Sequence, residues 1–215
     1  MILCFDSSAA HCAAVLVSEG AVLAQAREEM ARGQAERLVP LLEEVLGNAK
    51  VGWGELTAIG VCVGPGNFTG IRIAVAAARG LSLSVGVPAI GIPLLDTFVA
   101  QSGPVLALAD ARQDRVYAQV FRNEIPQADI ELTDMKKLAL AAPQPDWTVI
   151  GHRAEEAAAL LSAQAWEARE RVDLLRLAHL VEMRIADGRL ERAAPLYVRP
   201  ADAAPSSEPV PEMLD

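Results

Sequence analysis

The stretch from residue 56 to residue 92 constrains the fold of this 215-residue chain more than any other. Its apolar run at 56–63 is typical of a buried parallel strand, 69–85 has the pattern of a helix, and 88–92 is a second short apolar run. A glycine-rich loop at 64–70 joins the first strand to the helix. Because parallel strands need crossover helices that cover the faces of the sheet, the chain is predicted to be an α/β protein.

The first fifty residues add strands and a helix to this sheet. Residues 2–5, 12–17 and 22–27 are predicted as three short strands of a meander, since apolar runs alternate with polar turns. Residues 34–49 then change to helical spacing, with an apolar arc of about 160°, wider than one core contact requires. Pro40 either sits in the first turn or kinks the helix, which leaves the start of the helix open between residues 35 and 39. The order β-β-β-α-β-α-β predicts a mixed sheet with helices over it.

The second part of the chain repeats this opening in a shorter form. Strands are predicted at 105–110, 115–121 and 149–151, and helices at 154–169 and 174–187. We therefore expect two halves, with an N-terminal half at 1–97 and a degenerate C-terminal half at 98–199. The tail at 200–215 holds four prolines together with acids and serines, which predicts disorder.

Charge and composition limit the classes of function. The formal net charge is −9, with no run of Lys or Arg, so autonomous binding of tRNA or DNA is disfavoured. The three cysteines form no CxxC pair and are expected to be buried, reduced thiols. Arg72 and Arg79 interrupt the apolar run at 71–85, so no membrane span is predicted, and the N-terminus lacks the basic region of a signal peptide. The composition favours a soluble, cytoplasmic protein.

Two loops could bind an anion. The run Asp6-Ser7-Ser8 follows the first strand, where a carboxylate with hydroxyls could hold Mg²⁺ and a phosphate, although spacing alone favours a turn that these side chains stabilise. The loop at 64–70 precedes a helix, with Thr69 as its expected N-cap, and such a unit can cradle an anion. It contains no Lys, so it is not a Walker A loop, and it does not match GxGxxG.

Groups for metal binding or catalysis are sparse. His11, His152 and His179 are isolated, and no HExxH, HxxxH or GxSxG motif occurs. Asp110 ends a strand of the second half but is followed by Ala111 and Arg112 rather than by glycines, so side chains would crowd a second phosphate loop. No catalytic residue and no metal site are predicted.

The segment at 69–85 carries small residues along one face, which would allow another helix to approach closely. Packing within the chain and contact with a partner explain this face about equally well. The candidate partner-binding residues on the two predicted helices are Leu38, Leu42, Leu46, Gly70, Ala74, Ala77, Ala78 and Leu81.

Four motifs of the chain belong together. They are Asp6-Ser7-Ser8, Gly64-Pro65-Gly66-Asn67-Phe68-Thr69-Gly70-Ile71-Arg72-Ile73, Asp110-Ala111-Arg112 with Val116-Tyr117, and Pro195-Leu196-Tyr197-Val198-Arg199. With these motifs the chain resembles the bacterial TsaB (YeaZ) family over residues 1 to about 200. The family patterns that they match are Asp-Thr-Ser, Gly-Pro-Gly-Ser-Phe-Thr-Gly-Leu-Arg-Ile, Asp-Ala-Arg…Val-Tyr and Pro-x-Tyr-Leu-Arg. Asn67 replaces the usual Ser, and Gln34 stands where a His is common.

The resemblance implies an actin-like, sugar-kinase-like fold of two ribonuclease-H-type halves. It further implies a non-catalytic, glycoprotease-like subunit in the formation of threonylcarbamoyladenosine at position 37 of ANN-decoding tRNAs. Such a subunit pairs with TsaD through the two N-terminal helices, is joined by TsaE, and forms a homodimer when alone. ATP and Mg²⁺ would be used by the assembled complex, with no cofactor bound tightly by this chain and tRNA bound only through the complex. The alternatives are an independent ATP-binding phosphotransferase, a peptidase, and a plain homodimeric binding module.

Overall fold

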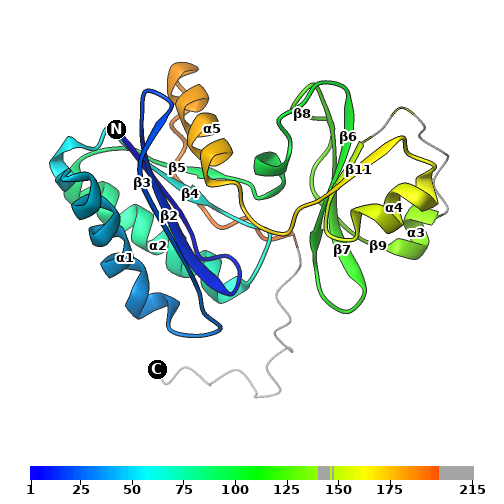
Figure 1. Cartoon of the computed structure of the whole chain (residues 1–215), viewed down its shortest axis with the longest axis horizontal. Helices are drawn as coiled ribbons and strands as arrows, with labels where there is room; N and C mark the ends of the chain where they lie inside the picture. The colour runs from blue at the N-terminus through cyan, green and yellow to red at the C-terminus, as the bar shows by residue number, and fades with distance from the viewer. Residues whose placement is uncertain (140–145, 147, 199–215) are drawn as a thin grey trace, which may run out of the picture.

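The computed structural model describes residues 1–139, 146 and 148–198, and the predicted tail at 200–215 lies outside this range. The chain forms two halves, each built on its own sheet (Figure 1). The bounds of the strands of the first sheet are β1 (Ile2–Asp6), β2 (His11–Ser18), β3 (Ala21–Glu29), β4 (Ala58–Cys62) and β5 (Ala89–Ile92).

The first sheet has the order β3-β2-β1-β4-β5. β1 is antiparallel to β2 and parallel to β4, and β4 is parallel to β5. The prediction of a mixed sheet is therefore confirmed. Helices α1 (Gln34–Ala49) and α2 (Phe68–Val85) cover one face of the sheet, and α5 (Leu174–Ala186) covers the other.

The alternation of side chains along β1 explains why both faces need a cover. Leu3 and Phe5 point into the core under α1 and α2, whereas Cys4 belongs to the core on the α5 side. Because each face is buried, the central strands are almost continuously apolar.

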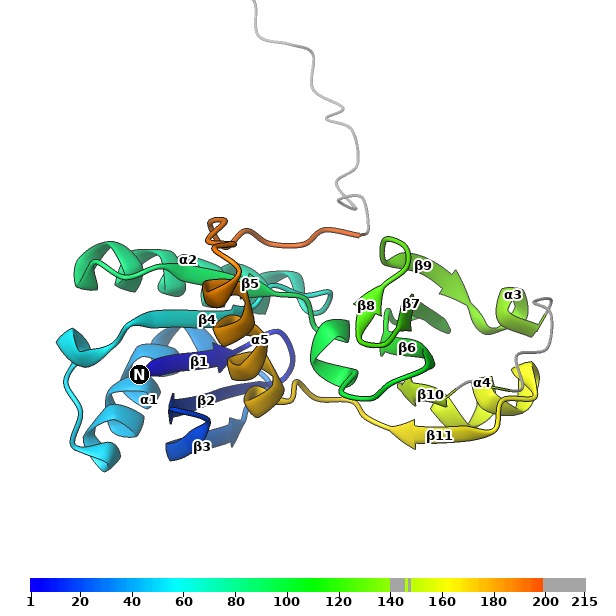
Figure 2. The ribbon, with the colours of Figure 1, turned by 90° about the horizontal axis from the view of Figure 1, so that it is seen from above.

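The second sheet has the order β11-β10-β6-β7-β8, with β9 paired to β7. Helices α3 (Met135–Ala139) and α4 (Ala154–Leu161) lie on its outer face, as Figure 2 also shows. The strands are β6 (Pro104–Asp110), β7 (Arg115–Arg122), β8 (Ile125–Pro126), β9 (Glu131–Asp134), β10 (Thr148–Gly151) and β11 (Ala165–Ala168), and short 3-10 helices are η1 (Trp53–Glu55) and η2 (Leu95–Phe98).

Three sequence predictions of local structure are wrong. The segment predicted as one helix at 154–169 is α4 followed by strand β11, which pairs in parallel with β10. α1 begins at Gln34, one residue before the predicted limits of 35 and 39, so that of the two positions considered for Pro40 the one inside the helix is found. The N-cap of α2 is Asn67, whose Oδ1 accepts from the Thr69 amide at 3.1 Å, and not Thr69 itself.

The boundary of the second half also differs from the prediction. α5 packs on the first sheet, and the segment after it runs along the edge of β5, where the Ala193 amide donates to the Ala89 carbonyl at 3.2 Å. The segment 98–199 is therefore not one body, because its last part completes the first half.

α2 is, in the described ranges, the one helix long and apolar enough to cross a membrane. The two arginines in it do not exclude a span by length and composition, contrary to the sequence analysis. In the structure, however, Ile71, Ala74 and Ala78 are buried against the first sheet, so α2 serves as a core helix.

Candidate functional site

The turn after β1 holds a fully buried carboxylate. Asp6 Oδ1 accepts a hydrogen bond from the Ser8 amide at 2.9 Å, and Oδ2 lies 2.7 Å from Nε2 of His11. Both carboxylate oxygens thus have partners within the chain, as expected for a buried charged group. The geometry favours the reading of this run as a turn that its own side chains stabilise.

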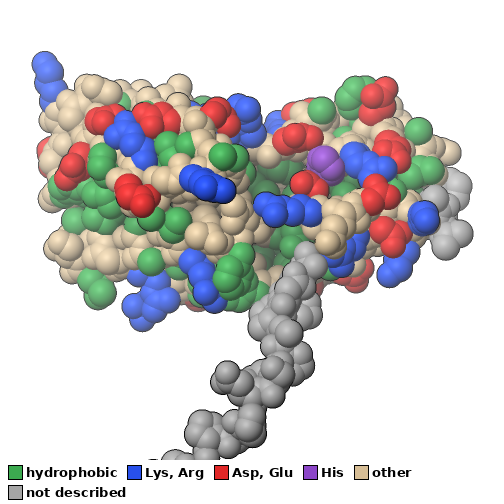
Figure 3. All heavy atoms as spheres, turned by 90° about the horizontal axis from the view of Figure 1, so that it is seen from below, with side chains coloured by type: hydrophobic (Ala, Val, Ile, Leu, Met, Phe, Trp, Pro, Cys, Tyr) green, Lys and Arg blue, Asp and Glu red, His purple; other side chains and the backbone are tan. Residues whose placement is uncertain are grey.

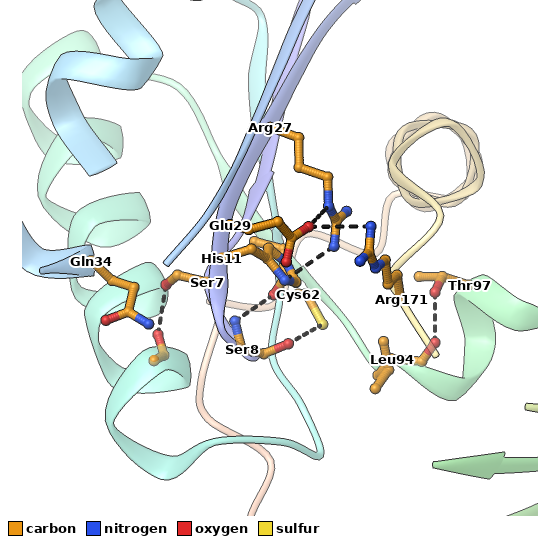
Figure 4. Close-up of polar contacts among 12 residues, drawn as sticks. Ser7, Ser8, His11, Arg27, Glu29, Gln34, Cys62, Leu94, Thr97 and Arg171 are labelled. Atoms are coloured by element: carbon orange, nitrogen blue, oxygen red, sulfur yellow. Dashed lines mark hydrogen bonds and ion pairs between the residues drawn. The ribbon is translucent and has the colours of Figure 1, made fainter. Parts of the chain in front are cut away.

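His11 is the residue that the sequence analysis missed, since it treated this histidine as isolated. Its Nδ1 lies 3.1 Å from a terminal nitrogen of Arg27, which can only donate. Nδ1 therefore accepts from Arg27, and Nε2 faces Asp6 as the donor. Both ring nitrogens are thus engaged within the chain. Figure 4 shows how this contact continues through Glu29 to Arg171, in the connection between the two halves.

The glycine-rich loop at 64–70 packs directly on the turn after β1. The Asn67 amide donates to the Ser8 carbonyl at 2.7 Å, and the Ser7 hydroxyl donates to the Gly70 carbonyl at 2.8 Å. A Cβ on Gly70 would collide with the Ser7 carbonyl oxygen, and one on Gly66 would lie 2.6 Å from that of Ser8. These two glycines permit close packing of loop on loop, and the Ser7 hydroxyl serves that packing.

Gln34, a position that departs from the family pattern, is buried at the start of α1. Its side-chain amide donates to the Met30 carbonyl at 3.2 Å, and its own carbonyl lies 3.8 Å from Cys12 Sγ. It therefore anchors the helix start to the preceding loop.

A cleft of about 1260 Å³ separates the two halves. Figure 3 shows this hollow, with hydrophobic side chains in its floor. The Asp6 turn and the 64–70 loop form its wall on the first half, and Asp110, Arg112 and His152 line it from the second. Nucleotides and other small ligands bind in clefts of this kind.

The wall on the second half presents side chains rather than a glycine loop. Arg112, Gln113 and Asp114 all have positive φ angles, of 59°, 53° and 60°. Asp110 Oδ1 accepts from the Arg112 amide at 2.8 Å, so this carboxylate stabilises the turn. Arg112 lines the cleft on this side, where the first half presents the glycine-rich loop.

Three side chains form a stacked cluster at the mouth of the cleft. Arg72 Cζ lies 3.9 Å from the centre of the Phe68 ring and 5.7 Å from that of Tyr197, and its Nε donates to the Tyr197 hydroxyl at 2.8 Å. The two ring centres are 5.3 Å apart. Phe68 is 46% exposed and Tyr197 is 49% exposed. The cluster joins the 64–70 loop to the C-terminal segment, 125 residues apart in sequence.

The cysteines are free and buried. Burial raises the pKa of the Cys12 thiol to about 11, and burial together with the nearby Asp6 carboxylate raises the pKa of Cys62 well above its ordinary value. Thiols in this state remain protonated and unreactive. Over the part of the chain that the structure describes, no three His, Cys, Asp or Glu side chains are grouped so as to hold a metal ion.

The predicted partner-binding face needs correction. Six of its eight residues are buried in the chain's own core, namely Leu38, Leu42, Leu46, Gly70, Ala74 and Ala78. The wide apolar arc of α1 is covered because the helix packs against both the sheet and α2. Ala77 and Leu81 are partly exposed, and the same two helices expose Val39 and Leu83, at 38% and 78%.

Comparison with known proteins assigns the chain to a protein family. The family model described as "TsaD: tRNA N6-adenosine threonylcarbamoyltransferase" matches residues 22–158. The TsaB protein of Escherichia coli (strain K12) is 33% identical over 130 residues, which cover 57% of this chain and 56% of that protein. A solved structure from Pseudomonas aeruginosa, described as similar to peptidase YEAZ, superposes with a TM-score of 0.78 at 25% identity, over 92% of this chain and 99% of that one. The chain belongs to the TsaB (YeaZ) family.

The TsaB protein of Haemophilus influenzae gives a similar picture, with 30% identity over 131 residues that cover 58% of this chain and 55% of that protein. The matched region thus spans little more than half the length of these curated relatives. An ATP-glucomannokinase from Arthrobacter has a TM-score of 0.50 at 11% identity, which shows a shared fold alone. The predicted actin-like, sugar-kinase-like fold is confirmed.

Proposed function

We propose that this chain is a non-catalytic subunit of the machinery that forms threonylcarbamoyladenosine at position 37 of ANN-decoding tRNAs. The names of the curated relatives, "tRNA threonylcarbamoyladenosine biosynthesis protein TsaB", support this pathway. The observation that carries the non-catalytic role is the commitment of the Asp6 and His11 side chains to each other and to Ser8 and Arg27. Asp6 is fully buried and both its oxygens and both His11 ring nitrogens already have partners within the chain, so proton transfer or binding of Mg²⁺ there would have to disturb these contacts.

In this role the chain pairs with a TsaD-type catalytic subunit in the cytoplasm, and TsaE and ATP join the assembled complex. The match of the TsaD family model to residues 22–158 supports pairing between two chains of one fold. The partly exposed apolar side chains on α1 and α2, Val39, Ala77, Leu81 and Leu83, are the proposed contact, which a second copy covers when TsaD is absent.

The test is to reconstitute tRNA modification from purified components. Modified nucleoside should form with this chain, TsaD, TsaE, ATP, threonine and bicarbonate, and should fail to form when this chain is left out. Equal yields with and without the chain would refute the proposal.

The size of the cleft favours one competing function, that of an independent ATP-binding phosphotransferase. Magnesium-dependent binding and turnover of ATP by the isolated chain, both lost on Asp6→Ala, would support that function instead.

A further inference from the structure

The cluster of Phe68, Arg72 and Tyr197 is not explained by folding alone. Arg72 makes no ion pair in the described part of the chain, although the sequence contains 28 acidic residues. Its Cζ lies 3.9 Å from the centre of the Phe68 ring, and its Nε donates to the Tyr197 hydroxyl at 2.8 Å. The terminal nitrogens are therefore presented in one orientation, ready to donate to an anion.

The rings beside this guanidinium are about half exposed, so flat aromatic surface lies next to the positive charge. The rings and the guanidinium together suit a nucleotide, because unpaired bases stack on aromatic rings and guanidinium planes, and arginines bind phosphates. The geometry points to one nucleotide of the tRNA substrate as the ligand, bound at the mouth of the cleft when the chain is joined to its TsaD-type partner. This inference rests on the proposed function.

Two observations favour RNA over a protein partner. The cluster lies at the N-terminal end of α2, away from the proposed protein contact. Leu83, the most exposed apolar residue of that contact, lies near the C-terminal end of the helix, about 16 Å from Arg72 at a rise of 1.5 Å per residue. An arginine that forms no ion pair with a carboxylate of the described residues also suits a phosphate. The net charge of −9 means that the partner must supply most of the affinity and that this chain adds a single contact.

The experiment measures tRNA affinity of the assembled complex as a function of salt, with an unmodified transcript of an ANN-decoding tRNA. Arg72→Gln should reduce the slope of log K against log salt by about 0.7, the value for one phosphate of a single strand. Tyr197→Ala should weaken binding about 5- to 150-fold, as for loss of one stacked base, and should leave that slope unchanged. Arg72→Lys should keep the slope because it keeps the charge, and should lose part of the affinity.

Arg122→Gln is the matched control, because it removes from the second half one exposed arginine that forms no ion pair with any other described residue. It should leave the affinity and the slope unchanged. The complex formed by each variant is sized before binding is measured.

Three outcomes would overturn the inference. Failure of Arg72→Gln or Tyr197→Ala to assemble with the partner would make the cluster a protein contact. Normal assembly with unchanged tRNA binding and salt slope would make it a stack that serves the fold alone. Loss of affinity for free adenine nucleotide, with tRNA binding intact, would assign it to the nucleotide instead. Failure of the proposed function differs from all three, since the unsubstituted complex would then bind but not modify tRNA.

Discussion

Asp96 lies in η2, at the crossing from the first half to the second, and packs against α5. In the described structure its Oδ1 is buried without a hydrogen-bond partner. Burial raises the pKa of this carboxyl from 3.8 to about 6, although Arg184 and Arg176 act in the opposite direction. We therefore expect Asp96→Asn to stabilise the protein at neutral pH.

The sign follows from proton linkage. Because the folded state holds the Asp96 proton more tightly than the unfolded state does, this group stabilises the fold most below pH 3.8, and the contribution is lost as pH rises through 6. A tenfold difference in proton affinity corresponds to about 1.4 kcal/mol, so the full effect is about 3 kcal/mol. Between pH 5 and pH 8, titration of Asp96 should lower the free energy of unfolding by about 1.4 kcal/mol of that total.

The assay is urea unfolding of both proteins at several pH values. The free energy of unfolding of Asp96→Asn, minus that of the unsubstituted chain, should rise by about 1.4 kcal/mol from pH 5 to pH 8. Subtraction removes the titration of every other group. The neighbouring cations keep other partners, since Arg176 pairs with Glu124 at 2.5 Å and Arg184 donates to the Gly91 carbonyl at 2.6 Å. Asp129→Asn, at an exposed site, should give a flat difference. A flat or falling difference for Asp96→Asn would refute the reasoning.

Three further predictions concern α2 and the cleft. Gly70→Ala should lower the free energy of unfolding by about 3 kcal/mol, because the added Cβ collides with the Ser7 carbonyl. Gly80→Ala, which has open space around the added Cβ, should raise the free energy of unfolding by about 0.5–1 kcal/mol. Equal effects of the two substitutions in urea unfolding would contradict the close packing at Gly70. Ala77→Glu should leave the circular dichroism spectrum intact and abolish both self-association and TsaD pairing, measured by light scattering and pull-down, because it places a charge in an apolar contact. The isolated chain should not hydrolyse ATP, and turnover abolished by Asp6→Ala would contradict the non-catalytic role.

The sequence predicts the first half well because the apolar residues of its strands and helices recur at regular spacings. The strands alternate between two covered faces, and α1 and α2 carry helical spacing, so these elements are found within a few residues of their predicted positions. The failure at β11 has a physical reason, since Ala165–Ala168 becomes a strand through pairing with β10 rather than through its own propensity.

The site is less predictable, because its contacts are distant in sequence. An apolar arc shows that a helix face will be buried, but the arrangement of α1 beside α2 decides that the chain itself covers Leu42 and Ala74. In the same way, the contact of Arg72 with Tyr197 arises only when the chain returns from the second half to the first.

That return makes the second half an insertion between β5 and α5, with the chain crossing twice at neighbouring points. Arg169 Nη1 lies 3.5 Å from the Thr97 carbonyl, so the outgoing and incoming segments touch. The halves are thus joined by two segments that contact each other, whereas a single linker would leave their relative orientation less restricted. The Arg176–Glu124 ion pair, which joins α5 to the turn between β7 and β8, adds a further contact between the halves.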